Sequence, residues 1–341
     1  MKLPDYHFIS APLWLVTVLH LLTLALHFAA MGAVFGGTLI TLWASARGRW
    51  SGAEATGLIR LLPATTAATV TIGVAPLLFL QLVYPAQTYA STITIGWFWL
   101  LVPAAVIVAY YALYRASFSG HRTGRANVGA LALAVAALVY VSLVYSSVFA
   151  LAETPAQVKA LYAATQSGWA WNPEPGAYLA RWSHMALGAL TLGAFFVGVV
   201  GKDSPAMTAT AKTAFAGGMA AAAAAGVAYL LSLGSHLRPF MRSSGMIVLT
   251  VAIVLSLAAL HFFFRRRFWL SGTALFLSLL GMVYARHDLR LIRLAGSFDP
   301  GTWRVAPQWS PFLLFLVCFL VMLGVLGWMV KLFLTRSEPA A

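Results

Sequence analysis

The sequence has little charge and almost no cysteine. Only 9% of its 341 residues are charged and 61% are hydrophobic, which excludes a soluble globular domain of this length. The one cysteine, Cys318, lies inside an apolar run, so there is no disulfide framework, no CxxC metal pair and no CxxCH motif for c-type haem. The first residues, MKLPDYHF, lack the basic region and cleavage site of a signal peptide, so we expect the first apolar segment to be retained.

Long apolar segments predict an all-α integral membrane protein. About 20 apolar residues suffice for a helix to cross a bilayer, and the chain has about nine such segments in one polytopic domain over residues 1–341. Pro63 and Pro76 in the second segment and Pro103 in the third predict kinks or re-entrant backbone. The predicted spans are 11–45, 57–84, 95–115, 127–151, 178–201, 210–233, 244–264, 268–290 and 309–334.

Lysine and arginine gather in the loops on one side of the predicted bundle, which the positive-inside rule assigns to the cytoplasm. The longest loop, 152–177, lies on the other side and is predicted to form an extracytoplasmic cap. We therefore expect a multi-pass protein of the bacterial inner membrane with its N-terminus outside and its C-terminus in the cytoplasm. Topology explains most of the net charge of +14, so we expect contacts with membrane lipids and none with nucleic acid. Six arginines on the outer side need another explanation: Arg238, Arg242, Arg286, Arg290, Arg293 and Arg304.

Most of the histidines are predicted to lie near the outer side of the membrane. An imidazole in lipid is unfavourable without a partner, so an intramembrane histidine is a functional candidate. His184 lies one turn inside the fifth span, above the small residues Gly188, Gly193 and Ala194. Small residues allow either a neighbouring helix or a flat macrocycle to approach. The alternative is a histidine that is only hydrogen-bonded to a neighbouring helix.

His20 and His27 are seven residues apart, which is two helical turns and about 10 Å on one helix face. This separation is too long for one metal ion bound by both. It suits a haem ligand with a second group or ligands to two haems, and the alternative is a histidine that only packs. Inside the predicted spans the only acid is Asp288, which disfavours oxygen-ligated metals and buried proton delivery. Imidazole and thioether remain, and these are ligands of b-type haem.

Three arginines follow one another at helical spacing in YARHDLRLIRL, at the end of the eighth span. Arg286, Arg290 and Arg293 are four and three residues apart, so they project from one face if the helix continues. Such a cluster suits haem propionates, because guanidinium groups pair with carboxylates through two hydrogen bonds. The alternatives are anionic lipid headgroups or salt bridges to Asp288 and Asp299.

Several segments resemble subunit I of the cytochrome bd quinol oxidases. The resemblance covers most of the chain, and its residues are Gly193-Ala194-Phe195-Phe196 nine residues after His184, Asn172-Pro173 in the preceding loop, Gly36 nine residues after His27, and Gly73-Val74-Ala75 in the second span. It implies a bundle of nine helices with an external N-terminus, in which His27 and His184 bind haem.

The chain departs from that family where the family reduces oxygen. Only GSHLRPFMRSS separates the sixth and seventh spans, where the family has a long quinol-binding loop. The third span lacks the family's glutamates, Gln81 replaces the acid of the second span, and YARHDLRLIRL replaces a segment with a haem-ligating glutamate. In the family, a methionine pairs with the histidine of the fifth span as the second haem ligand. Met246 is close to the matching position in this sequence, but an alignment anchored on Arg242 puts Ser244 at that position. His236 is another candidate for this ligand.

We therefore expect a membrane electron-transfer subunit with two or three b-type haems and no role in oxygen reduction. It would pass electrons between the quinone pool and an extracytoplasmic partner such as a multihaem c-type cytochrome, as part of a hetero-oligomeric quinol-oxidising or quinone-reducing complex. The expected axial ligands are His27 and His184, with further candidates His20, Met246, His236 and His287, and the expected propionate ligands are Arg242, Arg286, Arg290 and Arg293. The alternatives are a haem-free anchor that docks a periplasmic redox protein, a true bd-like terminal oxidase subunit, or a transporter with broken helices.

Overall fold

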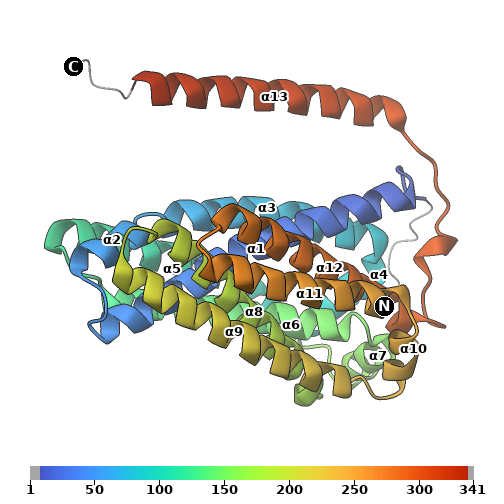
Figure 1. Ribbon diagram of the computed structural model, residues 1–341. Helices are drawn as coiled ribbons and strands as arrows, with labels where there is room; N and C mark the ends of the chain where they lie inside the picture. Colours follow the sequence, from blue (N-terminus) through green and yellow to red (C-terminus); the bar gives the residue numbers. More distant parts are fainter. Residues whose placement is uncertain (1–7, 337–341) are drawn as a thin grey trace. The chain divides into compact units, whose positions relative to one another are not determined.

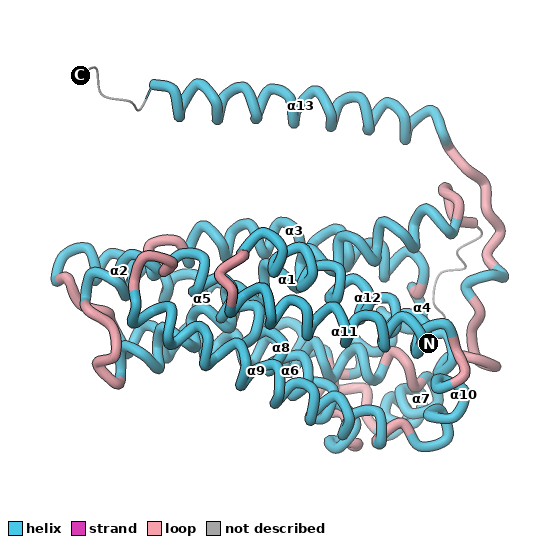
Figure 2. The backbone as a smooth tube through the Cα atoms, in the orientation of Figure 1, coloured by secondary structure: helices cyan, strands magenta, loops and turns pink. Residues whose placement is uncertain are grey.

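The computed structural model describes residues 8–336, whose named elements are all helices, and residues 17–299 form a helical bundle (Figures 1 and 2). Residues 17–299 form one unit, and the described residues 8–16 and 300–336 belong to a second. The helices are α1 (Leu13–Ala46), α2 (Gly52–Ile59), α3 (Leu62–Val83), α4 (Pro85–Thr94), α5 (Gly96–Thr123), α6 (Val128–Leu151), α7 (Pro155–Ala164), α8 (Pro175–Val200), α9 (Pro205–Leu231), η1 (Gly234–His236), α10 (Leu237–Met241), α11 (Ser244–Phe264), α12 (Phe268–Leu294), η2 (Pro300–Thr302) and α13 (Trp309–Arg336).

Nine segments within the described residues are helical, long and apolar enough to cross a membrane, which confirms a multi-pass membrane protein. The seventh segment has the predicted bounds, Ser244–Phe264. The third runs to Thr123 and the sixth begins at Pro205, beyond the predicted ends. Capping residues set these two ends: Gly124 adopts the left-handed conformation after α5, and Ser204 accepts the Met207 N–H before α9.

The second span is interrupted at its first proline. Helix α2 ends at Ile59, and α3 begins at Leu62 with Pro63 in its first turn, where the missing N–H of proline has no helical partner to lose. Pro76 and Pro103 lie inside α3 and α5, and both helices continue through them. The helix is therefore interrupted just before Pro63, whereas the backbone stays helical at Pro76 and Pro103 and is not re-entrant there.

Helices α1 and α8 touch through glycine. A Cβ atom added to Gly36 would lie 2.2 Å from the Ala189 carbonyl oxygen, and one added to Gly193 would lie 2.3 Å from the Gly36 carbonyl carbon. Only glycine permits backbones to approach so closely. Gly193 is thus occupied by helix packing. By contrast, a Cβ atom added to Gly188 would meet nothing within 4 Å.

The largest apolar core joins the helices around Phe215 of α9 and Phe263 of α11, whose rings stack 4.5 Å apart. The predicted cap, 152–177, contains helix α7 and packs on the beginning of α5. There the Trp169 ring stacks 5.6 Å from that of Trp97, and Trp171 Nε1 donates to the Tyr178 hydroxyl at 2.8 Å. These contacts fix the segment that joins α6 to α8.

Candidate functional site

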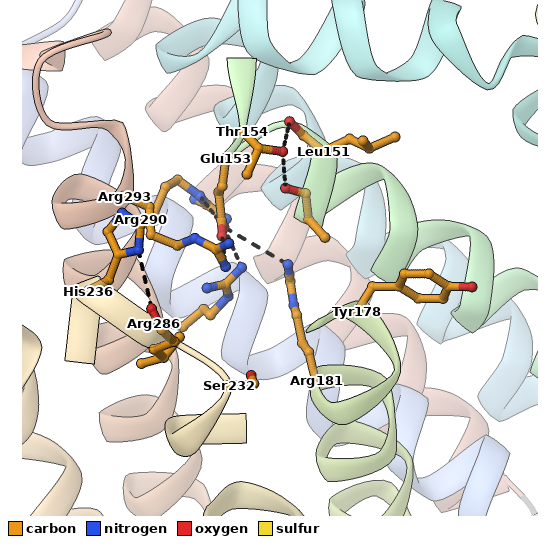
Figure 3. A network of polar contacts seen from close by, with 12 residues as sticks. Leu151, Glu153, Thr154, Tyr178, Arg181, Ser232, His236, Arg286, Arg290 and Arg293 are labelled. Carbon is orange, nitrogen blue, oxygen red and sulfur yellow. Dashed lines mark hydrogen bonds and ion pairs between the residues drawn. The ribbon is translucent and has the colours of Figure 1, made fainter. Parts of the chain in front are cut away.

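A buried carboxylate lies at the centre of four arginines (Figure 3). Glu153 follows the end of α6 by two residues, and its side chain is only 1% exposed. Arg181 of α8 and Arg286, Arg290 and Arg293 of α12 point toward it. We call these five residues the arginine cluster.

The four guanidinium groups meet the carboxylate at different distances. Arg286 Nη2 donates to Glu153 Oε1, and Arg290 Nε lies 3.5 Å from the same oxygen. Arg293 Nη1 lies 3.5 Å from Oε2, and Arg181 Nη1 lies 4.0 Å from Oε1. One carboxylate thus holds together the ends of α6, α8 and α12.

Aromatic side chains supply further partners for the cluster. Arg286 Nη1 donates to the Tyr229 hydroxyl of α9 at 3.0 Å. The Arg290 guanidinium lies 5.3 Å from the centre of the Tyr84 ring, and that of Arg181 lies 5.8 Å from the Phe149 ring. An aromatic face attracts a cation, so these rings partly replace the water that the arginines lost.

The cluster carries more positive than negative charge. Burial by itself would raise the pKa of Glu153, but the charges of Arg286, Arg181, Arg290 and Arg293 lower it to about 2, so this carboxyl is ionised at ordinary pH. Arg181 Nε and Nη1, together with Nε of Arg286 and Arg293, are buried and have no hydrogen-bond acceptor among the described residues. Buried charges are normally paired, so the cluster has the capacity to hold a further anion.

Three of the arginines predicted to lie on the outer side share one helix face as expected, but their acid is not the expected one. Arg286, Arg290 and Arg293 do share one face, because α12 continues to Leu294. Their common acid is Glu153. Asp288 instead accepts the Gly245 N–H at 3.1 Å, at the start of α11.

Arg242, the fourth of the predicted propionate ligands, is not a member of the arginine cluster. Arg242 is exposed at the end of α10, and none of the described ion pairs with Glu153 involves it.

Two histidines of α1 face α3. His27 Nδ1 donates to the Thr69 carbonyl and His20 Nδ1 to the Pro76 carbonyl, both at 3.1 Å. The two carbonyls are seven residues apart, as are the histidines, which confirms that both histidines share one face. Because a carbonyl oxygen only accepts, Nδ1 carries the proton in each ring and Nε2 carries the lone pair. The ring of His27 also lies over Gly73, where an added Cβ would be 2.6 Å from Cε1.

His184 of α8 repeats this arrangement against α9. Its Nδ1 donates to the Ala222 carbonyl at 2.8 Å, and an added Cβ at Gly226 would lie 2.9 Å from the same nitrogen. In both cases the glycine follows the accepting residue by four positions. Histidines that ligate a metal usually donate their other ring N–H in this way, which fixes the tautomer and the ring orientation. The same bonds also satisfy a histidine that only packs.

The other predicted ligands are spread over the bundle. His236 Nδ1 bonds the Leu233 carbonyl of its own turn at 3.3 Å, and Met246 packs against an apolar cluster that contains Leu233 and Phe240. His287 Nδ1 is buried without a hydrogen-bond partner in the described part of the chain. His287 and His20 lie close enough to interact electrostatically with each other and with Arg290.

The part of the chain that the structure describes shows no candidate site for a bare metal ion. Over residues 8–336, no three histidine, cysteine, aspartate or glutamate side chains gather in a way that could hold one. Iron held by a porphyrin needs only one or two protein ligands, so the histidines described above meet its requirement.

Sequence reasoning missed Glu153 as a member of the site. The sequence places it in the predicted cap, 152–177. One signal in the sequence could have indicated this role. Glu153 directly follows the fourth span, on the same predicted side of the membrane as Arg181 at the start of the fifth span and the three arginines at the end of the eighth span.

Comparison with models of known protein families gives no match for this chain, and comparison with curated proteins gives none either. The resemblance to subunit I of the cytochrome bd quinol oxidases therefore stays a prediction from the residues that carry it.

Proposed function

We propose that this multi-pass membrane protein is a b-type haem electron-transfer subunit. The observation that supports the proposal best is the tautomer of His184 and His27. Each donates Nδ1–H to a backbone carbonyl of a neighbouring helix, so each has Nε2 available for haem iron. When bound, haem supplies one-electron transfer, and the chain supplies ligands, orientation and charge.

The surroundings of His184 suit a flat macrocycle. Gly188 lies one helical turn after His184 on the same face, and space for a side chain is open there. The Ala222 carbonyl would hold the imidazole in orientation and raise its basicity as a ligand. His184 is therefore our first choice of axial ligand, and His27 is the second.

The charge of the arginine cluster suits the two propionates of a haem. Four guanidinium groups and one carboxylate leave three positive charges, and Asp299, which lies near Tyr84, offsets at most one of them. Two propionates would supply two negative charges and would give the unpaired N–H groups of Arg181 and Arg293 their acceptors. We propose Arg181 as an addition to the predicted propionate ligands.

The composition of the spans supports the proposed electron transfer between a quinone and an extracytoplasmic partner. Acids are almost missing from the spans, which disfavours oxygen reduction and favours transfer between the quinone pool and an extracytoplasmic redox protein, such as a multihaem c-type cytochrome. The alternative of a haem-free docking anchor required the outer arginines as its surface. Arg286, Arg290 and Arg293 are at most 18% exposed, which removes them from such a surface, whereas Arg238, Arg242 and Arg304 are exposed and stay available to it.

The test is a reduced-minus-oxidised visible spectrum of the purified protein, with a pyridine haemochrome to count haem per chain. We expect at least two b-type haems, with His184→Ala and His27→Ala each losing one of them. His261→Ala is the matched control, because His261 is exposed on α11. A protein without a Soret band would refute the proposal and favour the anchor. Full haem content in His184→Ala would refute the ligand assignment.

A further inference from the structure

A polar recess lies where α8 ends and α9 begins, next to the turn between α11 and α12. The arginine cluster lies instead at the start of α8 and the end of α12. Its volume is about 530 Å³. The residues that line it include Lys202, Asp203, Pro205, Thr208, Lys212 and Arg266. Three of them are cations, and each comes from a different element: the α8–α9 turn, α9 and the α11–α12 turn.

The cations are held in place by the backbone and by a ring. Arg266 has φ 57°, a left-handed conformation that favours glycine, and its Nη2 donates to the Lys202 carbonyl. Lys212 Nζ lies 5.5 Å from the centre of the Phe264 ring. These contacts join the two turns across the recess and fix two of its three positive groups at its wall.

The same end of the bundle carries exposed apolar side chains. Trp269, three residues after Arg266, is 85% exposed at the start of α12, and tryptophan is enriched at the level of lipid headgroups. Exposed Val254, Leu257 and Phe264 continue along α11 away from the recess. A ligand bound here therefore meets positive charge at one end and apolar surface at the other.

We propose that this recess binds the headgroup of an anionic phospholipid. Its phosphate would lie among Lys202, Lys212 and Arg266, and its acyl chains would follow the exposed face of α11. Basic pockets between membrane helices are a known way to recognise such lipids. A free phosphate would use the same cations but would leave the apolar face uncovered. This proposal is independent of haem.

The test measures lipid retained by the full-length protein in neutral detergent, by native mass spectrometry after addition of phosphatidylglycerol or phosphatidylcholine. We expect selective retention of phosphatidylglycerol. Arg266→Gly and Lys212→Gln should each weaken that retention about fivefold, the effect of one cation near a membrane surface. Glycine suits the left-handed conformation at residue 266, so this variant is expected to fold.

Arg265→Gln is the control, because it removes one charge from the neighbouring residue, which does not line the recess. Equal losses in Arg265→Gln and Lys212→Gln would overturn the proposal in favour of general surface charge. Equal retention of the two lipids would also overturn it. Displacement of phosphatidylglycerol by millimolar inorganic phosphate would overturn the lipid assignment and indicate a soluble anion.

Discussion

Gly36 of α1 and Gly193 of α8 are in backbone contact, and each lies nine residues after a histidine, His27 and His184. Nine residues of helix span about 13 Å. The two histidines therefore lie at equal distances along their helices from one crossing point. Their rings turn to different neighbours, since His27 bonds α3 and His184 bonds α9. For the proposed haem function, this arrangement favours two haems, each with one of these ligands, over one haem held between both.

The glycine contact should be sensitive to a single methyl group. Gly36→Ala and Gly193→Ala would place a Cβ atom on the backbone of the other helix, so we expect each to lower stability by about 1–3 kcal/mol, the usual effect of overpacking. Thermal unfolding in detergent measures this. Gly217→Ala is the control, because a Cβ there meets nothing within 4 Å. Equal midpoints in all three variants would contradict a tight crossing.

Gly188 offers a test of the haem position that leaves the helix packing intact. Gly188→Leu fills open space, so we expect the thermal midpoint of the haem-free protein to change little. If a haem lies beside His184, the leucine side chain would exclude it and about one haem per chain would be lost. Gly217→Leu on α9 is the matched control. Unchanged haem content in Gly188→Leu would place any haem elsewhere.

Glu153 predicts a characteristic dependence of stability on pH. Its pKa is about 2 in the folded protein against 4.5 for a free side chain, so its contribution is complete above about pH 4.5 and is lost as pH falls toward 2. Loss of one partner of a buried ion pair costs about 3–5 kcal/mol. The stability difference between the natural protein and Glu153→Gln should therefore be constant from pH 8 to pH 5 and shrink below.

Glu153→Asp controls for the loss of shape at this position, because it keeps the charge. It should show the same dependence on pH with a smaller loss of stability. A difference between the natural protein and Glu153→Gln that stays constant down to pH 2 would show that the carboxylate charge is not what stabilises the cluster.

The Tyr229 hydroxyl should stabilise the cluster through Arg286. Tyr229→Phe removes the acceptor of the Arg286 Nη1–H and leaves this buried donor without a partner, at a cost of about 1–3 kcal/mol. Chemical or thermal unfolding measures this loss. Tyr111→Phe serves as the control, because Tyr111 is 73% exposed on α5. Similar small changes in both variants would mean that the hydroxyl contributes nothing measurable.

Hydropathy predicts the spans well because each one is a local property of the sequence, and the seventh was predicted to the residue. The shared face of Arg286, Arg290 and Arg293 was also predictable, since it depends only on helical spacing. Their acid was not. Glu153 is separated from Arg181 by 28 residues and from Arg286 by 133, so no local pattern connects them. Likewise, no pattern in the sequence pairs Gly36 with Gly193 or His184 with the Ala222 carbonyl.

The distance along the chain between Glu153 and α12 has a consequence for biosynthesis. At about 5–20 residues per second, the 133 residues from Glu153 to Arg286 take roughly 7–27 seconds to synthesise. During most of that time Arg181 is the one member of the four arginines that has already been made. The cluster is complete only after the eighth span, α12, has been inserted. The ion pairs of Glu153 then connect α12 to the end of α6, a helix that was synthesised much earlier.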